Sequence, residues 1–145
     1  MADYFTHFYC LLDVKTPENA ARAIELYHEL QEAHRYITDE DLAEEPEPLG
    51  FRLSVQSGLE GTRLWIHDDV TGDPEDVIRF VRRCAKLFGL SGLWGFQYAN
   101  TCSKLRINSF RGGAHVLDLS TGDTVGWTDT DGWFSRVLDG GDPDV

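Results

Sequence analysis

The sequence predicts a single α+β domain in which strands and helices follow the order β-α-β, β-α-β. Two observations carry this prediction. Two segments with helical spacing each begin with a capping residue followed by proline, and segments of alternating apolar residues precede and follow each of them. The length of 145 residues, with 41% hydrophobic and 26% charged residues, is ordinary for one domain with a continuous core. We therefore expect one domain over residues 1–145.

The first strand and the first helix are predicted over residues 3–37. Residues 3–14, DYFTHFYCLLDV, are apolar on both of the faces that alternate along a strand, which is typical of a central strand. The helix that follows, over residues 16–37, has Thr16 as its N-cap and Pro17 at its first helical position. Its apolar residues recur at helical spacing: Ala20, Ala23, Ile24, Tyr27, Leu30 and Ile37.

Residues 51–57 and 62–67 are predicted to form two strands. Each alternates apolar and polar residues, and the four residues GLEG between them indicate a hairpin. In the arrangement that we expect, the first and third strands are adjacent and parallel.

The acidic stretch WIHDDVTGDPEDV, residues 65–77, is interpreted mainly as the start of the second helix. Asp73 followed by Pro74 repeats the pattern of the first helix start, and acidic side chains stabilise the positive end of a helix dipole. The helix should end at Phe88, before Gly89. The residues predicted to face inward are Val77, Ile78, Val81, Cys84, Ala85 and Phe88, while Arg79, Arg82, Arg83 and Lys86 should be solvated.

Residues 92–100, GLWGFQYAN, supply the fourth strand and complete the repeated order. This order resembles the ferredoxin-like βαββαβ arrangement, which implies an antiparallel sheet with two helices on one face. We expect residues 1–100 to form this core. A C-terminal strand and hairpin extension is expected over 101–134, turning at 121–123, and an acidic flexible tail over 139–145.

Net charge and composition narrow the classes of partner. A net charge of −12 disfavours direct binding to nucleic acid or to an anionic membrane surface, and the acidic clusters are interpreted as solvated loops. No apolar stretch is long enough for a transmembrane helix, and the N-terminus lacks the features of a signal peptide. We expect a soluble, cytoplasmic protein whose three cysteines, Cys10, Cys84 and Cys102, are reduced and buried.

The sequence predicts no catalytic residue, no metal site and no cofactor. The acidic stretches fit a calcium loop poorly, because apolar residues fall at its ligand positions. His7 and His67 are the best pair for a transition metal, but parallel neighbouring strands would offset them by about four residues, too far for one ion. Motifs for a serine nucleophile, a P-loop or a dinucleotide are absent from the sequence.

The sheet face opposite the helices is the predicted binding surface. It combines aromatic, cationic and polar residues: Phe5, His7, Tyr9, Arg52, Ser54, Gln56, Arg63, Trp65 and His67. We expect the C-terminal hairpin or a second copy of the chain to cover it. Trp94, Phe96 and Tyr98 share one face of the fourth strand, which the pattern does not assign.

These observations favour a non-catalytic protein-binding or regulatory module that acts on a protein partner or self-associates, for example as a homodimer. The contact surface would be the mixed aromatic sheet face or the C-terminal hairpin. Two alternatives stay open. The first is an acidic mimic of nucleic acid that inhibits a DNA- or RNA-binding protein, which requires the carboxylates to gather on one ordered face. The second is an enzyme without a recognisable motif.

Overall fold

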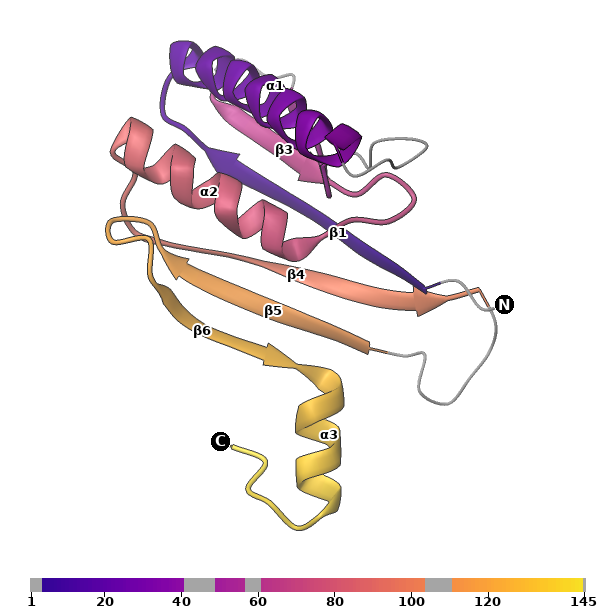
Figure 1. The fold of residues 1–145 in the computed structure, drawn as a ribbon. Coiled ribbons are helices and arrows are strands. Elements are labelled where there is room, and N and C mark those ends of the chain that lie inside the picture. Colours follow the sequence, from indigo (N-terminus) through magenta and orange to yellow (C-terminus); the bar gives the residue numbers. More distant parts are fainter. Residues whose placement is uncertain (1–3, 41–48, 57–60, 104–110, 145) are drawn as a thin grey trace.

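The computed structural model describes residues 4–40, 49–56, 61–103 and 111–144, with side chains as far as residue 33 in the first range. This described part has an α+β fold with a six-stranded antiparallel sheet and three helices (Figure 1). The strands occur in the order β2-β3-β1-β4-β5-β6. The elements are β1 (Tyr4–Asp13), α1 (Pro17–Glu40), β2 (Arg52–Val55), β3 (Arg63–His67), α2 (Pro74–Phe88), β4 (Leu93–Cys102), β5 (Arg111–Asp118), β6 (Thr124–Asp129) and α3 (Thr130–Leu138).

Strand β1 lies inside the sheet and changes neighbour along its length. Its residues 4–8 pair with β4, and its residues 9–13 pair with β3. Both pairings are antiparallel, so the prediction of parallel first and third strands is wrong. The reason is that β3 runs antiparallel to β2 and therefore returns in the direction opposite to β1. Tyr9 consequently lies opposite His67.

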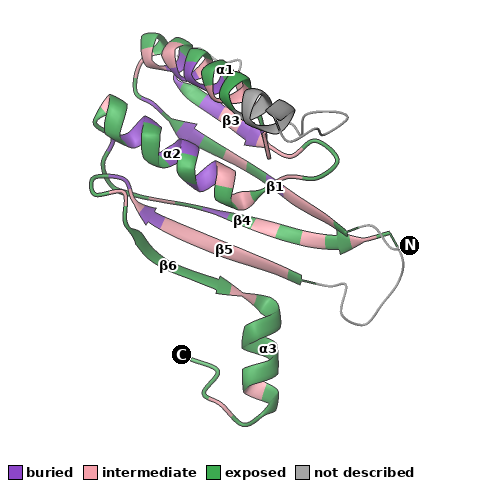
Figure 2. Ribbon diagram, in the orientation of Figure 1, coloured by how far each residue is buried: buried purple, intermediate pink, exposed green. Residues whose placement is uncertain are grey.

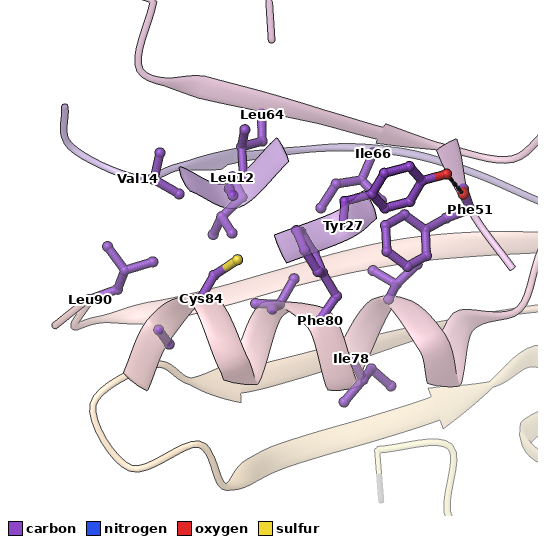
Figure 3. Close-up of a cluster of buried hydrophobic side chains, with 14 of the residues drawn as sticks. Leu12, Val14, Tyr27, Phe51, Leu64, Ile66, Ile78, Phe80, Cys84 and Leu90 are labelled. Carbon is purple, nitrogen blue, oxygen red and sulfur yellow. Dashed lines mark hydrogen bonds between the residues drawn. The ribbon is translucent and has the colours of Figure 1, made fainter. Parts of the chain in front are cut away.

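The core fills the space between α1, α2 and the sheet (Figures 1 and 3). Phe8 and Leu12 of β1 are buried, and so is Val14 just after the strand. Phe80 of α2 stands against two rings, with centroids 6.4 Å from Tyr27 and 5.2 Å from Phe51. Burying one such ring stabilises the fold by about 2–3 kcal/mol. The sequence interpretation omitted Phe80 from the inward face of the second helix.

Both predicted helix starts are confirmed. The hydroxyl Oγ1 of Thr16 accepts a hydrogen bond from the backbone N–H of Asn19 at 3.0 Å. The Asp73 side chain accepts one from the N–H of Glu75 at 2.9 Å. Each bond satisfies a backbone donor that has no partner inside its helix. At the other end, α2 stops after Phe88, as the sequence predicted, and Gly89 adopts the left-handed conformation with φ 64°.

The basic stripe on α2 is exposed, as expected, but it makes specific contacts. Arg79 pairs with Glu75 at 3.6 Å and with Asp76 at 3.4 Å. The Arg82 guanidinium donates hydrogen bonds to the carbonyl oxygen of Gly122 and to the hydroxyl of Thr124, at 2.7 and 3.1 Å. Arg82 therefore fastens α2 to the turn between β5 and β6.

The hairpin predicted in the C-terminal region is present as β5 and β6, which are antiparallel. Residues 119–123 connect them and the turn lies at 119–121, earlier than the predicted 121–123. The prediction that this hairpin covers the sheet face opposite the helices is wrong. It extends the edge of the sheet beyond β4, because β5 pairs with β4 along residues 111–118. Residues 104–110, predicted to continue as a strand, lie outside the described residues.

The pairing of β4 also settles the orientation of its aromatic side chains. Tyr98 lies opposite Phe8, so Trp94, Phe96 and Tyr98 share the face that carries the helices. Phe96 is buried there, and its ring contacts Phe8 edge to face with centroids 6.0 Å apart.

Among the described residues, no helix is long and apolar enough to cross a membrane.

Candidate functional site

The sheet surface turned away from α1 and α2, which we call the open face, carries the predicted binding residues. The register of β2, β3 and β1 arranges part of it in three rows: Arg52, His67 and Tyr9; Ser54, Trp65 and Leu11; Gln56, Arg63 and Asp13. Phe5 and His7 continue the same face along β1. The alternation in the sequence therefore assigned these side chains to one surface, although their use as a binding site stays a prediction.

Three of the predicted residues form an aromatic cluster across the first two of these rows. The ring of Tyr9 lies 4.9 Å from that of Trp65 and 5.5 Å from that of His67, measured between centroids. Trp65 and His67 are 5.5 Å apart. Tyr9 keeps 65% of its surface exposed despite these contacts. The other predicted residues lie outside this cluster. Gln56 and Arg63 are in the row farthest from His67, and the ring of Phe5 stacks on that of His7.

A chain of hydrogen bonds joins β1, the loop after β3, and β4. His7 Nδ1 lies 2.8 Å from Asp68 Oδ2, and His7 Nε2 lies 3.0 Å from Thr101 Oγ1. The other carboxylate oxygen of Asp68 accepts the backbone N–H of Phe8 at 3.0 Å. The Asp68 side chain is 14% exposed, against 41% for His7. We call these three side chains the Asp68–His7–Thr101 relay.

The charge of Asp68 fixes the direction of the hydrogen bond between His7 and Asp68. Partial burial acts to raise the pKa of Asp68, but the hydrogen bonds from His7 and from the Phe8 N–H outweigh it and hold the pKa below its ordinary value. An ionised carboxylate only accepts hydrogen bonds, so Nδ1 of His7 carries a proton. In the neutral imidazole, Nε2 is then an acceptor, and the Thr101 hydroxyl donates to it.

The loop that carries Asp68 follows β1 closely. The N–H of Asp68 donates to the carbonyl of Phe8 at 3.2 Å, and the N–H of Gly72 donates to the carbonyl of Thr6 at 2.9 Å. Between them, Val70 has φ 67°, a conformation that is unfavourable for a β-branched residue. The flanking hydrogen bonds hold this conformation and thereby fix the carboxylate of Asp68 against His7.

The remaining acids of the stretch 65–77 have structural partners. Asp69 Oδ2 accepts two bonds from the Arg52 guanidinium, at 3.1 and 3.0 Å. Asp76 Oδ2 accepts the backbone N–H of Gly50 at 3.0 Å, and Asp73 caps α2. Asp69 therefore fastens β2 to the loop between β3 and α2, and Asp76 fastens the loop before β2 to α2. The interpretation of this stretch as a structural element is confirmed at Asp73.

A hollow of about 540 Å³ opens on the open face where β1 and β4 part. Pairing between these strands ends at Phe8, and the Trp94 Nε1–H donates to the Leu11 carbonyl at 2.8 Å beyond that point. The floor includes two small residues, Gly95 and Ala114. The lining residues are Tyr9, Cys10, Leu11, Gly95, Phe96, Gln97, Ala114, His115 and Val116.

The cysteines are free thiols, as the sequence predicted. The prediction that all three are buried is correct only for Cys84, because Cys10 and Cys102 are half-buried. Burial raises the pKa of the Cys10 thiol and that of the Cys84 thiol to about 12. The thiolate is the nucleophilic form of cysteine, so these two residues are unreactive near neutral pH.

The histidines have separate partners on the open face. Antiparallel pairing brings His7 within two positions of the residue opposite His67, closer than the offset of about four that the sequence predicted. His67 Nδ1 nevertheless lies 2.8 Å from the Asp68 backbone oxygen, while His7 contacts the Asp68 carboxylate. Within the described ranges, no group of three histidine, cysteine or acidic residues could hold a metal ion.

A second surface is formed by β6 and α3, and we call residues 124–138 the C-terminal arm. The sequence analysis named the C-terminal hairpin, which includes β6, as an alternative contact surface, but it did not name α3. No residue of α3 is buried. Figure 2 shows that both elements are almost wholly exposed at the end of the sheet. The large apolar side chains exposed here are Val125 (58%), Trp127 (66%), Trp133 (43%), Phe134 (58%) and Leu138 (70%). The sequence signal for this surface was the presence of three aromatic residues, Trp127, Trp133 and Phe134, in an acidic segment only eight residues long.

Comparisons with known proteins assign the chain to no family, because no family model, no curated protein and no solved structure matches it.

Proposed function

We propose that this protein is a non-catalytic module that binds another protein through its C-terminal arm. The observation that carries the proposal is the exposure of five large apolar side chains on two elements that add little to the core. Exposed apolar surface costs solvation free energy, and contiguous patches of it are typical of protein interfaces. Aromatic side chains also dominate the binding energy of such interfaces.

Site-specific photo-crosslinking tests this proposal in cells that make the protein. A photoreactive residue replaces Leu138 in the full-length chain, and the matched control carries it at Leu87, an exposed leucine on α2 (70% and 52% exposed). We expect one discrete adduct from position 138 that is lost in Phe134→Asp. Equal adducts from both positions, or none from position 138, would contradict the proposal.

We infer that residues 4–102 form a ferredoxin-like βαββαβ unit and that the C-terminal arm is an addition to it. The order β2-β3-β1-β4 and the placement of α1 and α2 on one face support this inference (Figure 1). Because this fold serves many activities, the fold does not choose a function. We also propose a cytoplasmic location, which the free thiols support.

We propose the open face as a further contact surface for protein partners. Tyr9, Leu11 and Leu93 support this because 65%, 42% and 69% of their surfaces are exposed. The hollow beside Tyr9 could receive one apolar side chain of a partner, since apolar residues and the small residues Gly95 and Ala114 are among those that line it.

The Asp68–His7–Thr101 relay favours a second candidate function, an enzyme that transfers acyl groups through Thr101. A hydroxyl that donates to an imidazole held by a carboxylate is the arrangement of nucleophilic catalysis. As the Thr101 oxygen bonds to an acyl carbon, its proton would pass to His7 Nε2 and then to the leaving group.

Acetylation by 4-nitrophenyl acetate tests this candidate. The expected product is one acetyl group on Thr101, located by peptide mass mapping. Thr101→Ser should retain the acetylation and Thr101→Val should abolish it. Acetylation confined to lysine or cysteine side chains would exclude the candidate.

A further inference from the structure

The outer edge of β6 is free in the described part of the chain. Strand β6 ends the sheet and pairs only with β5. Alternate residues of an edge strand direct their backbone N–H and C=O groups away from the sheet, where a further strand can pair with them. After the register shift at Val116 and Leu117, residues 126–129 pair with β5 without interruption and present a regular edge.

Two features that normally prevent pairing at a sheet edge are missing from β6, and its β-bulge lies before residue 126. Its sequence, TVGWTD, contains neither lysine nor proline. Gly126 lies on this edge, and a Cβ atom placed there would meet nothing within 4 Å. A glycine in such a position permits the close approach of another backbone. The opposite edge of the sheet, β2, is shorter at four residues, and its Arg52 is bonded to Asp69.

The charge of this region selects the chemistry of a partner. From residue 118 to the C-terminus, the sequence holds seven aspartates and one basic residue, Arg136. A cationic segment would therefore be attracted to the edge, whereas a second copy would bring the same acidic charges against it. Trp127 and Val125, both more than half exposed on β6, offer apolar contacts to the same segment.

We propose that the outer edge of β6 binds an extended cationic segment of a partner protein as an additional strand, in which basic and large apolar residues alternate. This inference rests on the proposed function, protein binding through the C-terminal arm, and deepens it by naming the mode of binding. Backbone hydrogen bonds to residues 126–129 would give affinity, while alternating side chains would contact the aspartates and Trp127.

The probe for the test is a capped eight-residue peptide of alternating lysine and valine, added to the full-length protein. Hydrogen exchange of the β6 amides is followed residue by residue by NMR. At a free peptide concentration ten times its Kd, amides that pair with the peptide should exchange about elevenfold more slowly. An analogue N-methylated at alternate residues has the same charges but cannot donate along one edge, so it should give no such protection.

Two matched variants separate edge binding from general attraction to an acidic protein. Trp127→Lys and Leu87→Lys each replace an exposed apolar residue with lysine and change the net charge equally. We expect Trp127→Lys to weaken peptide binding about tenfold or more, and Leu87→Lys to leave it nearly unchanged. Equal binding of the N-methylated peptide, or equal weakening by both variants, would overturn the proposal.

The remaining outcomes distinguish this inference from the proposed function. Protection of β6 that rises with protein concentration without peptide would show that a second copy occupies the edge, which overturns a cationic partner. A crosslinked adduct from position 138 without peptide protection of β6 would overturn strand addition and keep binding by the arm. Failure of both experiments would remove the proposed function as well.

Discussion

His7 and Asp68 bond to each other across 61 residues of sequence, with Nδ1 and Oδ2 2.8 Å apart. Asp68 also accepts the Phe8 N–H, so one carboxylate fixes both the backbone and a side chain of β1. We predict that Asp68→Asn lowers the free energy of unfolding near neutral pH by about 2 kcal/mol, the usual effect of losing hydrogen bonds to a charged group. Urea denaturation measures this loss.

The same pair predicts a dependence on pH. The pKa of Asp68 is lower in the folded protein than its ordinary value, so its stabilisation is present above the ordinary carboxyl range and is lost as the pH falls through the folded pKa. The stability difference between wild type and Asp68→Asn should thus shrink below about pH 4. Asp123→Asn, at an exposed turn, is the control; a difference that is constant down to pH 2 would contradict the relay.

Asp73→Ala should lower stability by about 1 kcal/mol through loss of the N-cap of α2, while Pro74→Ala should be nearly neutral. The structural reason is the bond from the Glu75 N–H to the Asp73 carboxylate at 2.9 Å. Thermal melts of the two variants measure the difference. If Asp73→Ala melts like wild type, this side chain does not stabilise the start of α2.

Gly72→Ala is expected to destabilise the fold by about 1–3 kcal/mol through overpacking. A Cβ atom at Gly72 would lie 2.6 Å from the ring of Phe8 and 2.8 Å from the Gly50 carbonyl oxygen. Gly126→Ala is the control, because its Cβ atom would meet nothing within 4 Å. Equal stability of both variants in urea would show that the loop at Gly72 lies farther from Phe8.

Addition of Ca²⁺, Mg²⁺ or Zn²⁺ to metal-free protein should leave the melting temperature nearly unchanged, because the acids of residues 65–77 already have protein partners. A specific ion at a hundred times its Kd would instead stabilise the fold by about 2.7 kcal/mol. A rise of several degrees with one ion, abolished by Asp69→Asn together with Asp73→Asn, would contradict this prediction.

The features predicted correctly from the sequence are those that depend on neighbouring residues. The caps at Thr16 and Asp73 act within three residues, and alternation along one strand assigns Tyr9 and His7 to one face. Strand direction depends on how distant segments meet, which is why the parallel pairing was wrong. The Asp68–His7–Thr101 relay was not predicted for the same reason, because Thr101 lies 94 residues from His7 in the sequence.

The exposure of the C-terminal arm also could not be predicted from local sequence patterns. Trp127 alternates along β6 as a buried residue would, yet it is exposed because β6 forms the edge of the sheet that lies away from α1 and α2 (Figures 1 and 2). Phe80 was missed for the opposite reason. It lies on α2 between inward residues, and the aromatic partners that bury it, Tyr27 and Phe51, come from other elements.

The central claim, that α3 is a docking element rather than part of the core, is tested most directly by urea unfolding of the chain ended at Asp131. This truncation keeps the bond between Thr130 and Gly112 and the ion pair between Arg111 and Asp131, and it removes Trp133, Phe134 and Leu138. Because α3 buries no residue, we predict an unfolding free energy within about 0.5 kcal/mol of the full-length value. A loss of about 2 kcal/mol or more would show that these side chains pack into the core, and would contradict a free binding surface.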